Sequence, residues 1–307
     1  RKVGYPRWIW LLTRNQRAAP PEVPLPPLIP RGHADVSPEI VPIRRGHLRF
    51  AAAAIARPDP FGLFKACVTE PAPASVLILP RRYPIPRVPL PGARKYQPGG
   101  VALAASVGDS EEFAALRDYR PGDPLRRIHW KSWARLGKPI VKEYQDEFFV
   151  RHALVLDTFS QVEHSARFED AVSVAASFVC AIETQESLLD LLFVGPEAYS
   201  FTAGRGLAHA DRMLEVLACV QPCTTAPFAA LHRLVVDRHA ALSGAICVLL
   251  EWDADRHALI RDLEARGVPT LALVVGDGGT AVDEGPRATA GVHRLETGRV
   301  GEGLGRL

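Results

Sequence analysis

The residues best suited to chemistry lie in one stretch, residues 116–142, which reads LRDYRPGDPLRRIHWKSWARLGKPIVK. From residue 113 to residue 142 there are eight Lys or Arg side chains against two Asp, although the whole chain carries a formal net charge of only +3. Concentrated cations beside tryptophans would bind an acidic protein surface or lipid headgroups, since Trp and Arg often anchor interfaces. The candidate binding residues are Arg117, Asp118, Tyr119, Gly122, Asp123, Arg127, His129, Trp130, Lys131 and Arg135.

A helix is expected to present these side chains. Asp123 is a suitable N-cap, and Pro124 suits the first helical turn. Residues 127, 131 and 135 would then share one face at a spacing of four, which would make a basic stripe of Arg127, Lys131 and Arg135. Gly137 and Pro139 would end the helix.

A purely structural interpretation of the same stretch remains open. Its arginines would pair with nearby acidic side chains while Trp130 and Trp133 pack against a sheet; the acidic candidates are Asp118, Asp123, Glu143 and Asp146. Against this, residues 126–142 contain no acidic side chain, whereas a solvated helix face usually alternates its charges. His129 could act as a general base in principle, but the sequence shows no partner nucleophile, so a bond to a helical neighbour is the favoured interpretation.

The stretch resembles the signature of the bacterial family called domain of unknown function 58. The similar segments are Asp118-Tyr119, Pro121 to Pro124, Arg127 to Lys131 and Ala134-Arg135. Arg45-Gly46 and the DPFGLF sequence of residues 59–64 resemble the region that precedes that signature, and the chain after Val150 resembles the family's von Willebrand factor A-like domain. The resemblance spans roughly residues 30–275 and implies an adhesion-type α/β fold with an AAA+ ATPase of the MoxR type as partner.

The von Willebrand A-like resemblance also implies a metal-ion-dependent adhesion site, which begins with Asp-x-Ser-x-Ser at the end of the first strand. Here Asp157 is present, but Phe159 and Gln161 replace both serines. Mg²⁺ prefers carboxylate and hydroxyl oxygens in octahedral geometry, and the remaining candidate ligands are Asp157, Ser160, Thr225 (or its neighbour Thr224) and Asp253. The favoured interpretation is that the metal site has decayed and that Asp157 caps the loop or helix that follows it; bound Mg²⁺ is the alternative.

Several classes of enzyme lack their motifs here. The sequence contains no GxxxxGK[ST], no HExxH and no GxSxG. Its five cysteines lack the spacing of a zinc knuckle, so they are expected to be reduced thiols, with Cys180 and Cys247 buried in apolar runs. The nearly balanced charge argues against a general nucleic-acid binder.

Composition divides the chain into four parts. Residues 1–30 are a Pro-rich extended segment, residues 31–100 a β-rich unit, and residues 101–150 the signature segment with its basic helix. In the β-rich unit we expect strands at 40–43, 47–55 and 75–79, in an incomplete sandwich, with Phe61 and Phe64 anchoring the turn at 59–62. Residues 151–307 are predicted to form a von Willebrand A-like, doubly wound α/β domain with a mostly parallel sheet.

In this last part, apolar runs alternate with amphipathic segments. Strands are predicted at 152–156, 188–194, 245–250 and 270–275, with an edge strand at 292–295; helices are predicted at 168–183, 207–220 and 255–266. The strands are continuously apolar, as expected when helices cover both faces of a sheet.

The expected function is that of a non-enzymatic protein-interaction module, which by resemblance acts with a MoxR-type AAA+ ATPase in the assembly or maturation of other proteins. A metal-dependent ligand-binding or hydrolytic domain with a degenerate Mg²⁺ site is the alternative. The expected location is the cytoplasm, or the inner face of the cell membrane if a hydrophobic hairpin preceded Arg1, since Arg1, Lys2, Arg7 and Arg14 would be its cytoplasmic flank.

Overall fold

A computed structural model describes residues 17–18, 23–27, 29, 31–86, 95–96, 113–121, 123, 125, 128–144, 148–162, 165–182, 187–203, 207–277 and 291–307. The chain divides into two compact units, one of residues 1–81 with 214–220 and the other of residues 82–213 with 221–307. Within the described residues, no helix has both the length and the apolar character needed to cross a membrane.

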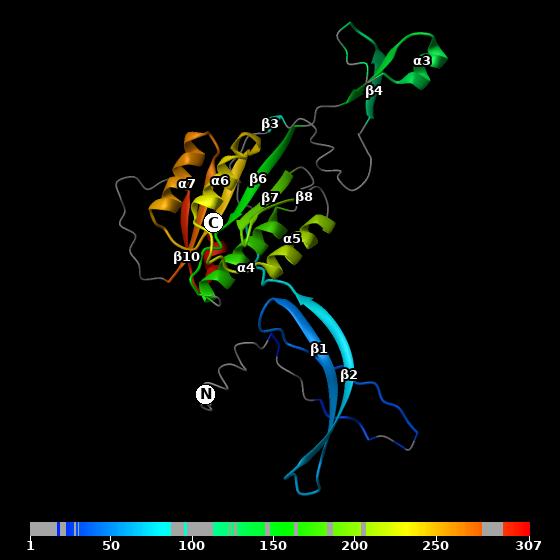
Figure 1. The fold of residues 1–307 in the computed structure, drawn as a ribbon, viewed down its shortest axis with the longest axis vertical. Helices are drawn as coiled ribbons and strands as arrows, with labels where there is room; N and C mark the ends of the chain where they lie inside the picture. The colour runs from blue at the N-terminus through cyan, green and yellow to red at the C-terminus, as the bar shows by residue number, and fades with distance from the viewer. Residues whose placement is uncertain are drawn as a thin grey trace. The chain divides into compact units, whose positions relative to one another are not determined.

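Residues 31–86 of the β-rich unit form a long two-stranded hairpin rather than an incomplete sandwich (Figure 1). Strand β1 (Gly46–Pro58) pairs antiparallel with β2 (Lys65–Ile78). The strand predicted at 40–43 does not form, and Pro42, which has no N–H to donate, makes only an isolated bridge.

The predicted turn closes this hairpin, but its aromatic side chains do not anchor it. The Asp59 carboxylate accepts hydrogen bonds from the backbone N–H groups of Phe61 (3.4 Å) and Phe64 (2.9 Å). Both phenyl rings are exposed, at 84% for Phe61 and 76% for Phe64. The turn is therefore held by its backbone bonds to Asp59, as is common for Asx turns.

The signature segment contains a second small sheet, in which β4 (Phe113–Asp118) pairs antiparallel with β5 (Ile140–Tyr144). Helix α3 (Trp130–Leu136) lies between them in sequence and begins six residues later than predicted. Asp123 does not cap it, because its carboxylate is bound to Arg117 and to the backbone N–H of Arg120. Gly137 ends the helix as predicted, with φ at 70° and its N–H bonded to the Trp133 carbonyl.

The α/β domain is built on a mostly parallel sheet with the order β11-β10-β9-β6-β7-β8. Its strands are β6 (Phe148–Leu156), β7 (Ser187–Val194), β8 (Ala198–Ala203), β9 (Gly244–Leu249), β10 (Thr270–Gly276) and β11 (Val292–Glu296). Only β8 runs antiparallel to its neighbour in this path. The short strand β3 (Lys95–Tyr96) pairs antiparallel with the start of β6.

Helices pack on both faces of this sheet (Figure 1). On one face lie α4 (Ala166–Ala181) and α8 (Val300–Leu304), and on the other α6 (Ala229–Val236) and α7 (Ala254–Ala265). Helix α5 (Leu207–Cys219) and a 3₁₀ turn, η2 (His239–Ala241), complete the described helical elements. All six residues of β9 are buried, as its continuous apolar sequence predicts.

The core under α6 and α7 takes side chains from four strands and both helices. Alternate residues of β6 divide between the two faces, so Ala153 and Val155 belong to this core.

Cys247 is buried as predicted, and burial raises the pKa of its thiol to about 12. Cys180 is only half-buried, and all five cysteines are free thiols.

Candidate functional site

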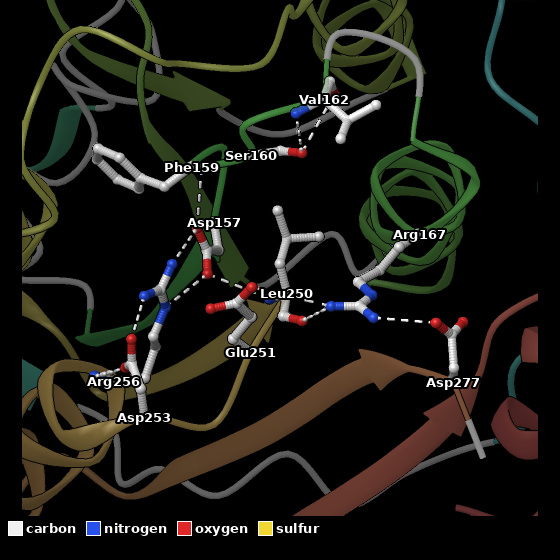
Figure 2. A network of polar contacts seen from close by, with 10 residues as sticks. All are labelled: Asp157, Phe159, Ser160, Val162, Arg167, Leu250, Glu251, Asp253, Arg256 and Asp277. Carbon is white, nitrogen blue, oxygen red and sulfur yellow. Dashed lines mark hydrogen bonds and ion pairs between the residues drawn. The ribbon is translucent and has the colours of Figure 1, made fainter. Parts of the chain in front are cut away.

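The order of the sheet reverses at β6. From this strand the chain proceeds to β7 and β8 on one side, and then to β9, β10 and β11 on the other. Ligands of open α/β sheets bind at such a switch point, beyond the carboxyl ends of the strands. Asp157 follows β6 there, and Leu250 follows the neighbouring strand β9 (Figure 2).

The Asp157 carboxylate is fully buried and accepts four hydrogen bonds. Its Oδ1 accepts from the backbone N–H of Phe159 (3.0 Å) and from Arg256 Nη2 (3.4 Å). Its Oδ2 accepts from the backbone N–H of Leu250 (3.1 Å) and from Arg256 Nε (3.0 Å). A carboxylate offers about four lone-pair positions, so these donors occupy its acceptor capacity.

Arg256 lies between two carboxylates (Figure 2). While its Nε and Nη2 face Asp157, its Nη1 donates to Asp253 Oδ2 at 2.5 Å. Asp253 is also the N-cap of α7, because its Oδ1 accepts the backbone N–H of Arg256 at 2.9 Å. One turn of helix therefore fixes both the arginine and its second partner.

Aromatic rings line the other side of the guanidinium. The Arg256 Cζ atom lies 4.4 Å from the centroid of the Phe228 ring, within cation–π range. Phe159 packs edge-on against Phe228, with ring centroids 5.5 Å apart. Phe159, at the position where the resembled pattern has a serine, is thus an apolar ring that supports Phe228 beside the arginine.

Burial and charge act in opposite directions on this pair. Burial is the largest influence on Asp157 and raises the pKa of its carboxyl, against the opposing effects of Arg256 and of the two backbone N–H groups. Burial alone would lower the pKa of the Arg256 guanidinium, but Asp157 and then Asp253 outweigh it and raise that pKa. The arginine therefore stays protonated in a site from which water is largely excluded.

The other two predicted metal ligands do not join this cluster. Ser160 exchanges hydrogen bonds with the backbone of Val162, its Oγ lying 3.2 Å from the carbonyl oxygen and 3.3 Å from the nitrogen. Thr225 is exposed, as is Thr224. Across the described residues no group of three His, Cys, Asp or Glu side chains is arranged to hold a metal ion. The donor set does not fit Mg²⁺, because Arg256 fills the acceptor positions of Asp157 that the ion would need.

A second arginine lies at the same edge of the sheet. Arg167 of α4 donates to the Leu250 carbonyl at 3.4 Å and to Asp277 Oδ2 at 3.1 Å, and lies 3.9 Å from Glu251 Oε1 (Figure 2). Sequence reasoning named neither arginine. Arg256 had a usable signal, since Asp253 in an N-cap position places the third helical residue within reach of its carboxylate.

The signature segment has its own ion pairs. Arg117 binds Asp123 through two parallel bonds of 2.7 and 2.8 Å, and with the backbone N–H of Arg120 this lowers the pKa of the Asp123 carboxyl to about 2. Lys138 pairs with Asp118 at 2.9 Å, and the Tyr119 N–H bonds the Pro139 carbonyl. The structure therefore brings four of the candidate binding residues together around β4, where their contacts stabilise the signature segment itself. These residues are Arg117, Asp118, Tyr119 and Asp123.

Helix α3 is exposed to solvent along its length. None of its seven residues is buried. Trp130, which is 63% exposed, stacks on the half-buried Trp133 with ring centroids 5.2 Å apart, so the alternative in which both tryptophans are buried against a sheet does not describe Trp130. Within the part of the chain that the structure describes, Lys131 and Arg135 have no ion-pair partner. Gly122 and Arg127 lie outside the described residues, so the stripe is defined here by Lys131 and Arg135.

His129 precedes α3, and its Nδ1 lies 2.6 Å from Ser132 Oγ. Such a pair resembles a base beside a nucleophile, but a working triad also needs a group that orients the imidazole. Among the described residues no carboxylate contacts His129. The pair has the geometry expected of a histidine bonded to a helical neighbour.

Together, the fold and the site define an α/β protein with a mostly parallel sheet, whose strand-end carboxylates are bound by arginines. Residues 115–267 match the family described as "Protein of unknown function DUF58". The match runs from β4 through α7, and so includes both the signature segment and the Asp157–Arg256–Asp253 cluster. It confirms the predicted family resemblance over this range.

One curated relative is "Uncharacterized protein YeaD" of Bacillus subtilis (strain 168). It is 30% identical over 126 residues, which make up 40% of this chain and 31% of the relative. The chain thus spans about a third of the length of the curated relative it matches.

Proposed function

We propose that this protein is a non-enzymatic protein-interaction module and that α3 is its docking surface. The observation that carries the proposal is the exposure of α3, which presents a stacked pair of tryptophans beside Lys131 and Arg135 and contains no acidic residue. Trp and Arg are enriched among the few residues that dominate binding energy at protein interfaces. Cations beside it favour a partner with an acidic surface.

The proposed partner is an AAA+ ATPase of the MoxR type, on the strength of the family resemblance, and the proposed task is the assembly or maturation of other proteins. The neighbouring ion pairs support this use of α3. Arg117 and Lys138 are already paired with Asp123 and Asp118, whereas Lys131 and Arg135 of the helix have no ion-pair partner among the described residues.

The proposed fold is the von Willebrand A-like one. The sheet order, which reverses at β6, and the single antiparallel edge strand β8 support that assignment. In this arrangement the Asp157 edge would be a second place for a partner to bind, distinct from α3.

Affinity purification from native cells tests the proposal, using wild type beside a Lys131→Glu/Arg135→Glu variant. The matched control is Arg233→Glu/Arg261→Glu, which reverses two exposed arginines on α6 and α7. We expect wild type and the control to recover the ATPase. The α3 variant should recover at least about tenfold less of it than wild type, since placing like charges opposite each other costs more than about 1.4 kcal/mol. Equal recovery by all three would exclude α3 as the surface. Recovery of no AAA+ ATPase would exclude the partnership.

A further inference from the structure

We infer that Arg256 is a resident cation that takes the place of a divalent metal at the carboxyl edge of the sheet, so that this edge keeps its structure without metal. The inference is independent of α3 and concerns how the charge of Asp157 is neutralised.

Arg256 binds the carboxylates of both Asp157 and Asp253 at this edge of the sheet. A metal at this edge would bind oxygens of Asp157 and Asp253, and the Arg256 guanidinium contacts both of these carboxylates, at 3.0 and 2.5 Å. Guanidinium presents its N–H donors in a fixed planar fork. One arginine thus bridges two carboxylates, as one metal ion does, while its positive charge offsets theirs.

The Arg256–Asp157 pair is buried. The Arg256 side chain is 7% exposed and that of Asp157 is 0% exposed, so neither charge is stabilised by bulk water. A buried charge without a partner is strongly unfavourable. The ionised form of Asp157 therefore needs a cation, and removal of the arginine leaves a place for another one.

The surroundings of the guanidinium are aromatic. The Phe228 ring lies against the guanidinium, and Phe159 supports that ring. Aromatic rings stabilise a flat, weakly hydrated cation such as guanidinium, whereas Mg²⁺ keeps several of its waters. The aromatic lining therefore favours arginine over a hydrated metal ion.

Substitution of Arg256 by Met should convert this edge into a metal site, because it leaves two carboxylates without their cation. We expect the Arg256→Met variant to bind Mn²⁺ with a dissociation constant on the order of 10⁻⁴–10⁻³ M. Binding is measured as the decrease in the electron paramagnetic resonance signal of unbound Mn²⁺. At 10 mM Mn²⁺ the melting temperature of this variant should rise by about 3 to 10 °C. Wild type should bind no Mn²⁺ at this edge and should shift by about 1 °C or less.

Two further variants keep the inference falsifiable. Arg256→Lys retains a cation, so it should not bind Mn²⁺ at this edge and its melting temperature should not respond to the ion. Asp157→Asn/Arg256→Met removes both buried charges, so it should fold and also ignore Mn²⁺. Mn²⁺ binding by wild type, or a folded Arg256→Met variant without a Mn²⁺ response, would overturn the inference. If Arg256→Met does not fold, folding of the double variant supports the charge argument, and its failure to fold overturns it.

Discussion

Replacement of Asp157 by Asn is the sharpest single test of the network at the sheet edge. The substitution keeps the shape of the side chain and removes its charge. It breaks a buried ion pair and leaves Arg256 with only Asp253, which is 42% exposed. It also replaces a carboxylate oxygen with an N–H₂ donor, which at either position would face both Arg256 and a backbone N–H group.

The expected cost follows from these contacts. Breaking a buried ion pair by removing one partner costs about 3 to 5 kcal/mol. For a domain of 150 to 250 residues, each kcal/mol corresponds to about 2 to 4 °C in melting temperature, so the melting temperature should fall by about 6 to 20 °C. The individual hydrogen bonds are not added to this figure, because contributions within one network are not additive.

Urea unfolding followed by far-UV circular dichroism measures the loss, since α4, α6 and α7 all belong to the α/β domain. The control is Asp255→Asn, which makes the same chemical change at an exposed residue in the first turn of α7. It should cost less than about 1 kcal/mol, the usual size of a helix-dipole interaction. An Asp157→Asn variant as stable as this control would refute the reasoning.

Two pH-dependent predictions accompany it. Burial lowers the pKa of His152 from its ordinary 6.5, so below pH 6.5 the unfolded chain holds more protons at this residue than the folded chain does. The urea midpoint should therefore fall as the pH drops from 7.5 to 5. It should fall less in a His152→Gln variant. For Asp123, a carboxyl titration by NMR should give a pKa of about 2. Arg117→Gln should raise that pKa toward 3.8, whereas Lys138→Gln, which removes the partner of Asp118, should leave it unchanged.

Much of the α/β domain could be predicted from sequence, because its strands are continuously apolar. The runs at 152–156, 245–250 and 270–275 all became strands of the sheet, and the edge strand at 292–295 formed as β11. Strand β8 and the short helices α6 and α8 were not predicted. Each has eight residues or fewer, so its pattern is too brief to mark a period; β8 forms by pairing with β7, and the two helices form by packing on the sheet.

The candidate site was less predictable, because its arrangement depends on long-range partners. Sequence marked Asp157 and Asp253, but it could not show that Arg256 would bridge them, since the arginine is 99 residues from Asp157. The start of α3 was misplaced for a different reason, a local pairing that competes with the cap. Asp123 is a good N-cap by type, yet the pairing of its carboxylate with Arg117 removes it from that role.

The most direct test of the proposed function is site-specific photo-cross-linking from α3. A photoreactive phenylalanine analogue replaces Trp130 in one variant. In a second variant it replaces Tyr199, an exposed aromatic residue of β8. We expect the analogue at position 130 to cross-link an AAA+ ATPase of the MoxR type in cells, with a yield that falls when Lys131 and Arg135 are changed to Glu. Cross-linking of this ATPase from position 199 but not from position 130, or from neither position, would contradict α3 as its docking surface.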